Sequence, residues 1–541
     1  MATVARGSAC PPGGRLRRDV AFLERRTSAD AGRELHGEIR TATLASLLRK
    51  KTAHLHMPST LLPTRTQVLI IGAGPGGICA GIELTRAGVT DFVIVEKVSG
   101  VGGTWWHNRY PGAECDVQSH LYSYSFEPNP NWSRPYAGQE EIRAYIEFVA
   151  RKYQMLPYCR FGVAVASAQW DESTAVWRVR TTTGALIEAR TIISAIGMFN
   201  DIVVPEIPGL DSFSGTQFHT ARWLANHDLK NKRVAIIGSA ASAVQAAPEL
   251  APIVAQLDLY QRTPQWVLPK KDDPFTPAEL AHFRAHPEVV RAHREELYVQ
   301  LEAAILFDDP QMLADAEAAA LQNLQSVNDA DLLRRLTPDW RYGCRRPLLS
   351  NKYFPIFNRA NVRLLDQGIE RIVPEGIVAA GGELRSVDTI ILATGFETTR
   401  YLSALDVTGR NGVHINDAWR DGAMAYLGIT TSGFPNLFML YGPNTNNNSL
   451  ITMLEMEVEY AVRCIRRLFD RSHQWMDVRN SAMATYNEQL QQDIAGVTVW
   501  RSDCRGYYRA PSGRIVTQFP YTMTQYTKML AADDIANYEV A

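Results

Sequence analysis

Short apolar runs alternate with glycine-rich turns and helix-like segments in two parts of the chain. Thr66 to Ile71 and Phe92 to Val95 flank the first turn, whereas Arg233 to Ile237 and Gln256 to Tyr260 flank the second. An apolar run that ends at such a turn and leads into a helical segment is typical of a strand–turn–helix–strand unit. The pattern therefore predicts two units of this kind and a protein of the α/β class.

The two turns carry small residues at matching positions. The first reads Gly72-Ala73-Gly74-Pro75-Gly76-Gly77, and the second reads Gly238-Ser239-Ala240-Ala241-Ser242-Ala243. A turn of this kind places the pyrophosphate of a dinucleotide on the N-terminus of the helix that follows. We therefore expect a dinucleotide at each turn, with Ala240 and Ala243 as departures from the glycine pattern.

Residues of opposite charge follow the two turns at the same distance. Glu96 lies 24 positions after Gly72, and Arg262 lies 24 positions after Gly238. An acidic side chain there binds a free ribose 2′-hydroxyl, whereas an arginine accommodates a 2′-phosphate. The first turn therefore predicts FAD or NAD, the second predicts NADP, and both together imply that electrons pass from NADPH to a bound flavin.

The regions after the two turns show a second repeat. Each is expected to form a three-stranded meander that ends in a turn of small residues. The expected strands are Gly162–Trp170, Ala175–Thr182 and Ala185–Ala195 in the first region, and Val362–Leu365, Ile369–Val378 and Glu383–Leu392 in the second. Between them, residues 270–341 are patterned as helices and predict a helical insert, which serves either as a lid over a substrate site or as a structural element.

Composition excludes several classes of protein. The chain has 541 residues and a net charge of −1, so no nucleic-acid partner is expected. No apolar run reaches the roughly 18 residues of a membrane span. No Cys-x2-Cys or Cys-x4-Cys pair exists, which argues against a zinc site and a redox-active dithiol. Scattered single cysteines favour a reducing, cytoplasmic location.

The first 56 residues differ from the rest in being rich in arginine without an apolar run, which excludes a secretory signal. We expect a partly helical extension without a catalytic role. A disordered arm and a later start at Met57 are the alternatives.

Two longer motifs bear on the chemistry. Gly102-Gly103-Thr104-Trp105 continues to Tyr110-Pro111-Gly112 and Asp116, and Phe213, Gly215, His219 and Trp223 follow before the second turn. The first segment resembles the pattern of Baeyer–Villiger monooxygenases, [Ala/Gly]-Gly-x-Trp-x4-[Phe/Tyr]-Pro-[Gly/Met]-x3-Asp, and the second resembles the fingerprint Phe-x-Gly-x3-His-x3-Trp of the same family. Trp105-Trp106 and the segment from Asn129 to Ser133 resemble the branch that acts on aryl ketones such as 4-hydroxyacetophenone.

The resemblance covers roughly residues 64–530 and implies two Rossmann-like dinucleotide-binding domains of the flavoprotein disulfide-reductase type. The domain boundaries that we expect are an N-terminal extension (1–60), an FAD-binding domain in two parts (61–199 and 392–541), an NADP-binding domain in two parts (200–269 and 342–391) and the helical insert (270–341).

The resemblance also implies an activity. Members of this family use NADPH to reduce FAD, form a C4a-peroxyflavin with dioxygen, and convert ketones to esters or lactones; sulfoxidation is a second expected activity. Arg346 would be the catalytic cation and Asp116 would hold it. The expected cofactor-binding residues are Gly72, Gly74, Gly77, Glu96, Gly103, Thr104, Trp105, Asp116 and Tyr122 for FAD, and Gly238, Ser239, Ser242, Arg262, Thr263 and Arg345 for NADP. The expected partners are a small ketone and dioxygen, and the expected assembly is a monomer or homodimer.

Alternatives remain open for the protein and for single residues. Flavin monooxygenases that oxidise nitrogen or sulfur share the two turns, but they carry Tyr or Phe where Trp223 stands. A disulfide reductase would need a cysteine pair that the sequence lacks, and a non-catalytic dinucleotide-binding module is the alternative from another class. Asp116 could cap a turn and Arg346 could be a solvated cation. The segment Cys504-Arg505-Gly506-Tyr507-Tyr508 departs from the family pattern, which leaves the size of the substrate open.

Overall fold

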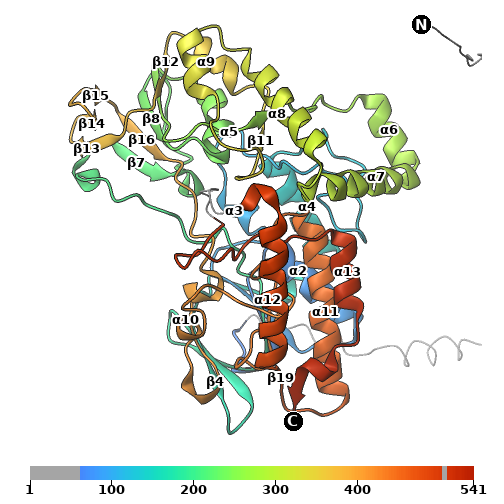
Figure 1. Ribbon diagram of the computed structural model, residues 1–541. Helices are drawn as coiled ribbons and strands as arrows, with labels where there is room; N and C mark the ends of the chain where they lie inside the picture. The colour runs from blue at the N-terminus through green and yellow to red at the C-terminus, as the bar shows by residue number, and fades with distance from the viewer. Residues whose placement is uncertain (1–60, 502–507) are drawn as a thin grey trace, which may run out of the picture. The chain divides into compact units, whose positions relative to one another are not determined.

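Two sheets hold most of the strands in the part of the chain that the computed structural model describes, residues 61–501 and 508–541 (Figure 1). The expected N-terminal extension, residues 1–60, and the departure at 504–507 lie outside the described residues. The chain from Pro58 to Ala541 is one compact unit. Its α/β fold of two dinucleotide-binding units confirms the fold class that the sequence predicts.

The first sheet has eight strands in the order β17-β4-β5-β6-β1-β2-β3, with β18 paired to β6. β1, β2, β3, β6 and β18 pair in parallel, whereas β4, β5 and β6 form the expected antiparallel meander. The strands are β1 (Arg65–Ile71), β2 (Phe92–Glu96), β3 (Cys159–Phe161), β4 (Val165–Asp171), β5 (Val176–Thr181), β6 (Leu186–Ser194), β17 (Asp406–Thr408) and β18 (Leu437–Met439). The last two come from beyond Gly395, so the C-terminal part returns to this sheet, as expected.

The second sheet has five parallel strands in the order β12-β9-β8-β16-β7. They are β7 (Thr216–His219), β8 (Arg233–Ile237), β9 (Gln256–Tyr260), β12 (Val362–Leu365) and β16 (Thr389–Leu392). Parallel strands buried on both faces need near-continuous apolar runs, and four of the five residues of β8 are buried.

The second meander is present, but its strands differ from the expected ones. The run Ile369–Val378 folds back on itself as β13 (Ile369–Val373) and β14 (Gly376–Ala379), and with β15 (Leu384–Ser386) it forms a separate antiparallel sheet. Pro374-Glu375 makes the turn, because proline has no amide to continue a sheet. Gly376 lies so close to the next strand that a Cβ there would be 2.0 Å from the carbonyl oxygen of Arg385.

Helices connect and cover the sheets. They are α2 (Pro75–Arg86), α3 (Thr104–His107), α4 (Gln139–Lys152), α5 (Ala241–Leu250), α6 (Pro277–Ala285), α7 (Pro287–Ile305), α8 (Pro310–Leu324), α9 (Ala330–Leu336), α10 (Ile415–Ala418), α11 (Leu450–Asp470), α12 (Asn480–Gly496) and α13 (Met523–Ala531). The expected helical insert is present as α6, α7 and α8, and α9 adds a helix that the pattern did not predict. Two short pairs complete the fold: β10 (Val267–Leu268) with β11 (Leu348–Leu349), and β19 (Met476–Val478) with β20 (Tyr538–Val540).

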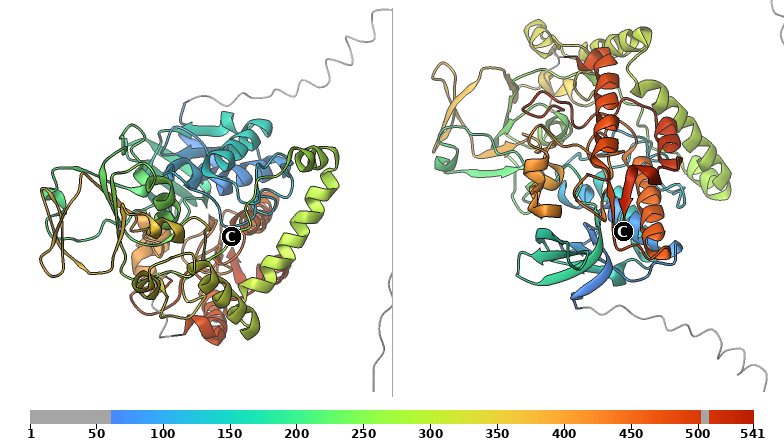
Figure 2. Two further views of the ribbon diagram at one scale, coloured as in Figure 1. Left: turned by 90° about the horizontal axis from the view of Figure 1, so that it is seen from above. Right: turned by 60° about the horizontal axis from the view of Figure 1, so that its bottom comes forward.

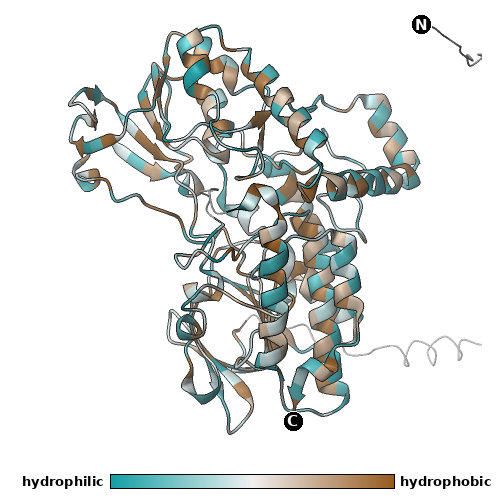
Figure 3. Cartoon of the chain, in the orientation of Figure 1, coloured by the Kyte–Doolittle hydropathy of each residue, from teal (hydrophilic) through white to brown (hydrophobic). Residues whose placement is uncertain are grey.

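Helix α11, in the C-terminal part of the chain, packs against α2, which is far away in sequence (Figures 1 and 2). Twelve of its residues are buried, and its apolar residues gather on one face, so that brown and teal alternate along the helix in Figure 3. This contact buries the first glycine-rich turn beneath the C-terminal part, because a Cβ at Gly76 would lie 3.1 Å from the Leu454 side chain. Within the described residues, no helix combines the length and the apolar character that a membrane span requires.

Candidate active site

The first glycine-rich turn connects β1 to α2 with almost no room for side chains. Gly72 has a φ of 109°, and a Cβ there would lie 2.5 Å from the carbonyl oxygen of Ala195. A Cβ at Gly77 would lie 1.9 Å from the carbonyl oxygen of Gly72. Gly74 is the N-cap of α2 and provides no side chain to cap it. The turn therefore presents a bare helix N-terminus, which is the structure that binds a phosphate group.

Glu96 lies directly beside this turn at the end of β2. Its carboxylate accepts hydrogen bonds from the backbone amides of Ala73 (2.8 Å) and Val98 (3.0 Å), and the residue is 6% exposed. The sequence interval between Gly72 and Glu96 thus corresponds to two adjacent parallel strands, with the acid at the edge where a ribose would lie.

Gly103, Thr104, Trp105 and Tyr122 lie next to the first turn. Gly103 has a φ of 56° and is the N-cap of α3, and a Cβ there would lie 3.0 Å from Cα of Gly74. Trp105 is buried and its indole donates a hydrogen bond of 3.1 Å to the Tyr122 hydroxyl. The two rings meet edge to face, with centroids 5.8 Å apart. The structure therefore brings these expected flavin-binding residues together.

The second turn repeats the geometry of the first. Gly238 has a φ of 118°, and a Cβ there would lie 2.3 Å from the carbonyl oxygen of Ala393. Ala240 is the N-cap of α5 with φ −89° and ψ −164°, close to the φ −75° and ψ −174° of Gly74. Any residue adopts these angles, so the alanine needs no strained backbone. Ala240 is exposed.

The expected NADP residues surround this second turn. The Ser239 hydroxyl donates to the carbonyl oxygen of Thr263 at 2.9 Å, and Ser242 interacts with the buried Tyr110 hydroxyl. Arg345 is half-buried, and its guanidinium lies 5.1 Å from the ring centroid of Trp340. Burial and the nearby positive charge of Arg262 both lower the pKa of Arg345. Two cations that repel each other in this way are suited to share an anion such as a 2′-phosphate.

Arg346 and Asp116 form an ion pair between the regions of the two turns. Nε of Arg346 lies 2.9 Å from Oδ2 of Asp116, and Nη2 lies 2.6 Å from Oδ1. Burial alone would raise the pKa of Asp116, but the charge and hydrogen bonds of Arg346 outweigh it and lower this pKa. The two side chains thus meet through two parallel hydrogen bonds, which orient the guanidinium relative to the carboxylate.

The free cysteines in the described part of the chain are not suited to redox catalysis. Cys115, beside Asp116, is buried, and burial together with the Asp116 charge raises the pKa of its thiol to about 12. Such a thiol stays protonated and unreactive at neutral pH. Cys79, Cys115, Cys159 and Cys464 are free, but Cys344 is disulfide-bonded. The expectation of single cysteines is therefore wrong at Cys344, since spacing along the chain does not reveal a distant pairing.

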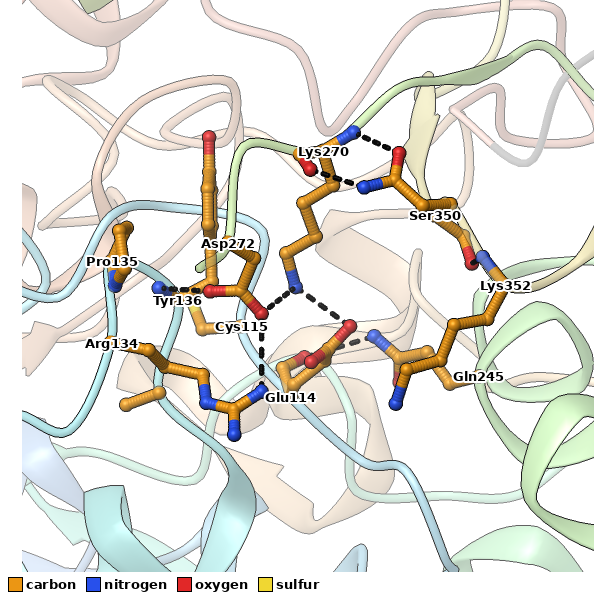
Figure 4. A network of polar contacts seen from close by, with 12 residues as sticks. Glu114, Cys115, Arg134, Pro135, Tyr136, Gln245, Lys270, Asp272, Ser350 and Lys352 are labelled. Carbon is orange, nitrogen blue, oxygen red and sulfur yellow. Dashed lines mark hydrogen bonds and ion pairs between the residues drawn. The ribbon is translucent and has the colours of Figure 1, made fainter. Parts of the chain in front are cut away.

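Sequence reasoning missed a polar network beside the Asp116–Arg346 pair. Lys270, Glu114, Asp272 and Gln245 belong to three distant segments that only the fold joins (Figure 4). The only available signal was the position of Glu114 inside the motif that ends at Asp116, at one of the variable positions of the pattern.

Comparison with known proteins agrees with this geometry. Residues 69–302 match the family described as pyridine nucleotide-disulphide oxidoreductase. This match and the two glycine-rich turns place the chain in the class of flavoprotein oxidoreductases with two dinucleotide-binding domains.

Individual relatives narrow this class. A Baeyer–Villiger monooxygenase of Pseudomonas aeruginosa is 38% identical over 89% of this chain and 93% of its own length. One from Streptomyces coelicolor is 39% identical over 88% and 92%. The structure of cyclohexanone monooxygenase from Rhodococcus sp. Phi1 bound to NADP+ superimposes with a TM-score of 0.81 at 29% identity, covering 88% of this chain and 99% of that one. The chain belongs to the Baeyer–Villiger monooxygenase family.

Proposed function

We propose that the protein is an FAD-containing, NADPH-dependent monooxygenase that converts a ketone to an ester or lactone. The reaction consumes a ketone, dioxygen, NADPH and a proton, and yields the ester, NADP+ and water. The observation that carries the proposal is the Arg346–Asp116 ion pair, in a chain with two glycine-rich turns of opposite expected ribose preference. Steroid monooxygenase, solved with NADP bound, is 30% identical over 88% of this chain with a TM-score of 0.78.

The residues at the first turn fit FAD. Side chains are excluded at Gly72 and Gly77, so the backbone leaves room for a pyrophosphate at the start of α2. Glu96 offers a carboxylate to an unphosphorylated ribose, and Trp105 and Tyr122 would line the ring system. When bound, FAD supplies the chemistry of accepting a hydride from NADPH and activating dioxygen.

The residues at the second turn fit NADP. Arg262 and Arg345 would bind the 2′-phosphate, with Thr263 beside them, and Gly238, Ser239 and Ser242 would hold the pyrophosphate at the start of α5. An arginine pair gains more from a phosphate dianion than from the neutral hydroxyl of NAD. We therefore propose a strong preference for NADPH over NADH.

Arg346 would act as a fixed cation near the ketone. During oxygen insertion, negative charge develops on the former carbonyl oxygen, and a preorganised cation stabilises it. The guanidinium remains charged at any pH at which the enzyme works. Asp116 would hold the guanidinium plane by its two hydrogen bonds, so that the cation is oriented before the substrate arrives.

The test is the variant Arg346→Ala in protein loaded with FAD. It should still oxidise NADPH but form no ester from a ketone that the wild type converts, with hydrogen peroxide as the product instead. Arg359→Ala, an exposed arginine on the surface, is the matched control and should behave as the wild type. Ester formation by Arg346→Ala at the normal rate would refute the assignment of Arg346. A thioether in parallel reports sulfoxidation.

We further propose that the enzyme acts in the cytoplasm as a monomer or homodimer. Four of the described cysteines are buried, free thiols, as is typical of a reducing compartment, whereas Cys344 is disulfide-bonded. The balanced net charge of −1 gives no attraction to nucleic acid. Size-exclusion chromatography with light scattering measures the assembly, and a mass corresponding to more than two chains would contradict it.

A further inference from the structure

Lys270 is a buried cation that no part of the proposed reaction uses directly. Its side chain is only 5% exposed, and its ammonium lies 2.7 Å from Oε1 of Glu114 and 3.8 Å from Oδ2 of Asp272. Figure 4 shows the ammonium between the two carboxylates. The same ammonium lies 4.6 Å from the ring centroid of Tyr136, whose amide donates to Asp272 at 3.0 Å. A buried lysine costs free energy unless it is paired, and this one is paired on both sides.

The backbone of Lys270 is attached to the segment that carries Arg346. β10, which ends two residues before Lys270, pairs in parallel with β11, which begins two residues after Arg346. The Lys270 amide donates to Oδ1 of Asn351 at 2.7 Å, and the Lys270 carbonyl oxygen accepts from Nδ2 of Asn351. A shift of Lys270 would therefore displace the strand next to Arg346.

The side chain of Lys270 is attached to the segment that carries Asp116. Glu114, its partner, lies two positions before Asp116 in the same loop. The carbonyl oxygen of Glu114 also accepts a hydrogen bond of 3.0 Å from Gln245 on α5, and Gln245 accepts one of 2.8 Å from the Tyr110 hydroxyl. The loop of Asp116 is thus attached at Tyr110, at Glu114 and, through Arg346, at Asp116 itself.

We propose that Lys270 is a positioning residue that holds Asp116 and Arg346 in register. It is the link that joins both members of the pair, through its backbone on one side and through Glu114 on the other. The proposal rests on the proposed function, since it assigns to Lys270 the task of keeping the catalytic cation oriented. A displacement of about 1 Å at such a site costs on the order of a hundredfold in rate.

Electrostatics at the pair supports the proposal. Burial has the largest effect on the pKa of Asp116 and raises it, and Arg346 lowers it. Lys270 also lowers this pKa, to a smaller extent. Glu114 carries one negative charge toward Lys270, and Asp272 is shared between Lys270 and Arg134, whose Nη1 lies 3.6 Å away. Within this network, Lys270 is the cation that favours the charged form of Asp116, and its own charge is balanced by the two carboxylates.

The first test compares Lys270→Met with Lys270→Arg and with Lys352→Met, all loaded with FAD. Lys352 is the matched control, because it forms an exposed ion pair of 3.1 Å with Glu249 nearby. The measured quantity is the ester formed per NADPH oxidised, with hydrogen peroxide as the other product. Lys270→Met should lower this ratio about tenfold or more. Lys270→Arg should recover most of it, and Lys352→Met should leave it at the wild-type value.

The double variant Lys270→Met/Glu114→Gln covers the case in which the single variant folds poorly. Removing both charges avoids leaving the half-buried Glu114 carboxylate without its lysine partner, so the Tm of the FAD-loaded protein should be higher than for Lys270→Met alone. Its ester ratio should remain low, since the link is still broken. A wild-type ratio in Lys270→Met or in Lys270→Met/Glu114→Gln would overturn the proposal. A wild-type protein that forms no ester from any ketone would refute the proposed function instead.

Discussion

Arg346 donates two parallel hydrogen bonds, of 2.9 and 2.6 Å, to the carboxylate of Asp116, although 230 positions separate the two residues. The fork fixes the plane of the guanidinium as well as its position. Both side chains are partly exposed, 41% for Arg346 and 27% for Asp116, so the pair contributes little stability as a salt bridge. Its geometry therefore points to orientation of a cation toward a ligand.

Asp116→Asn should separate orientation from folding. The amide keeps the size of the side chain but cannot accept two charged hydrogen bonds, so Arg346 loses its fixed plane. We expect ester formation to fall on the order of a hundredfold, while NADPH oxidation continues. Steady-state assays of ester, peroxide and NADPH check this, and Asp211→Asn, at an exposed position, is the control. Unchanged ester yield in Asp116→Asn would show that the pair does not orient the cation.

The pH dependence of this pair follows from the lowered pKa of Asp116. Because the pKa in the folded protein lies below the ordinary value of 3.8, the contribution of the pair to stability is present above that value and is lost as the pH falls through the folded pKa. Between pH 5 and 9 the pair should therefore remain intact, and Asp116→Asn should shift the Tm by the same amount throughout that range.

Arg262 and Arg345 should set the preference for NADPH. Each lies beside the second turn. Burial lowers the pKa of Arg345 most, and the positive charge of Arg262 lowers it further. Arg345→Met should raise the KM for NADPH about tenfold or more, since one charge-assisted contact with phosphate is worth roughly 1.5–3 kcal/mol. The KM for NADH, which has no 2′-phosphate, should change little.

The double variant Arg262→Met/Arg345→Met should bring the two coenzymes close to equality. The control is Arg363→Met, an exposed arginine on β12 of the same sheet. Initial rates with both coenzymes give the ratio of kcat/KM values. If the double variant retains the wild-type preference, the phosphate is bound elsewhere.

The sequence predicts the nucleotide turns well because each is a local feature. The interval from Gly72 to Glu96 is one strand, one helix and one strand, so the turn and the acid become neighbours in the sheet. The contact between Asp116 and Arg346 could be expected only from the family resemblance, and the structure has the two side chains in contact. The position of Lys270 could not be predicted, because its partners, Glu114 and Asn351, lie in other segments. The split of Ile369–Val378 was missed because apolar residues continue across the turn at Pro374.

A buried carboxyl group on α11 gives a prediction about stability that does not depend on catalysis. Glu457 is fully buried, and its Oε2 accepts a hydrogen bond of 2.6 Å from the backbone amide of Tyr441. Burial raises its pKa from 4.5 to about 8. Between these values the folded protein holds a proton that the unfolded chain has lost, so the contribution of Glu457 to stability falls as the pH rises toward 8.

Glu457→Gln removes this dependence while keeping an oxygen that accepts from Tyr441. The variant should therefore gain stability relative to the wild type as the pH rises from 5 to 8, by at most about 1.4 kcal/mol per pH unit, and the gain should level off above pH 8. Thermal unfolding of both proteins at each pH gives the difference in stability between variant and wild type. The titration of other groups affects both proteins equally and does not contribute to this difference. Glu459→Gln, on the exposed face of the same helix, is the control. A flat difference for Glu457→Gln would contradict this prediction, because it would mean that Glu457 is ionised in the folded protein over the whole range.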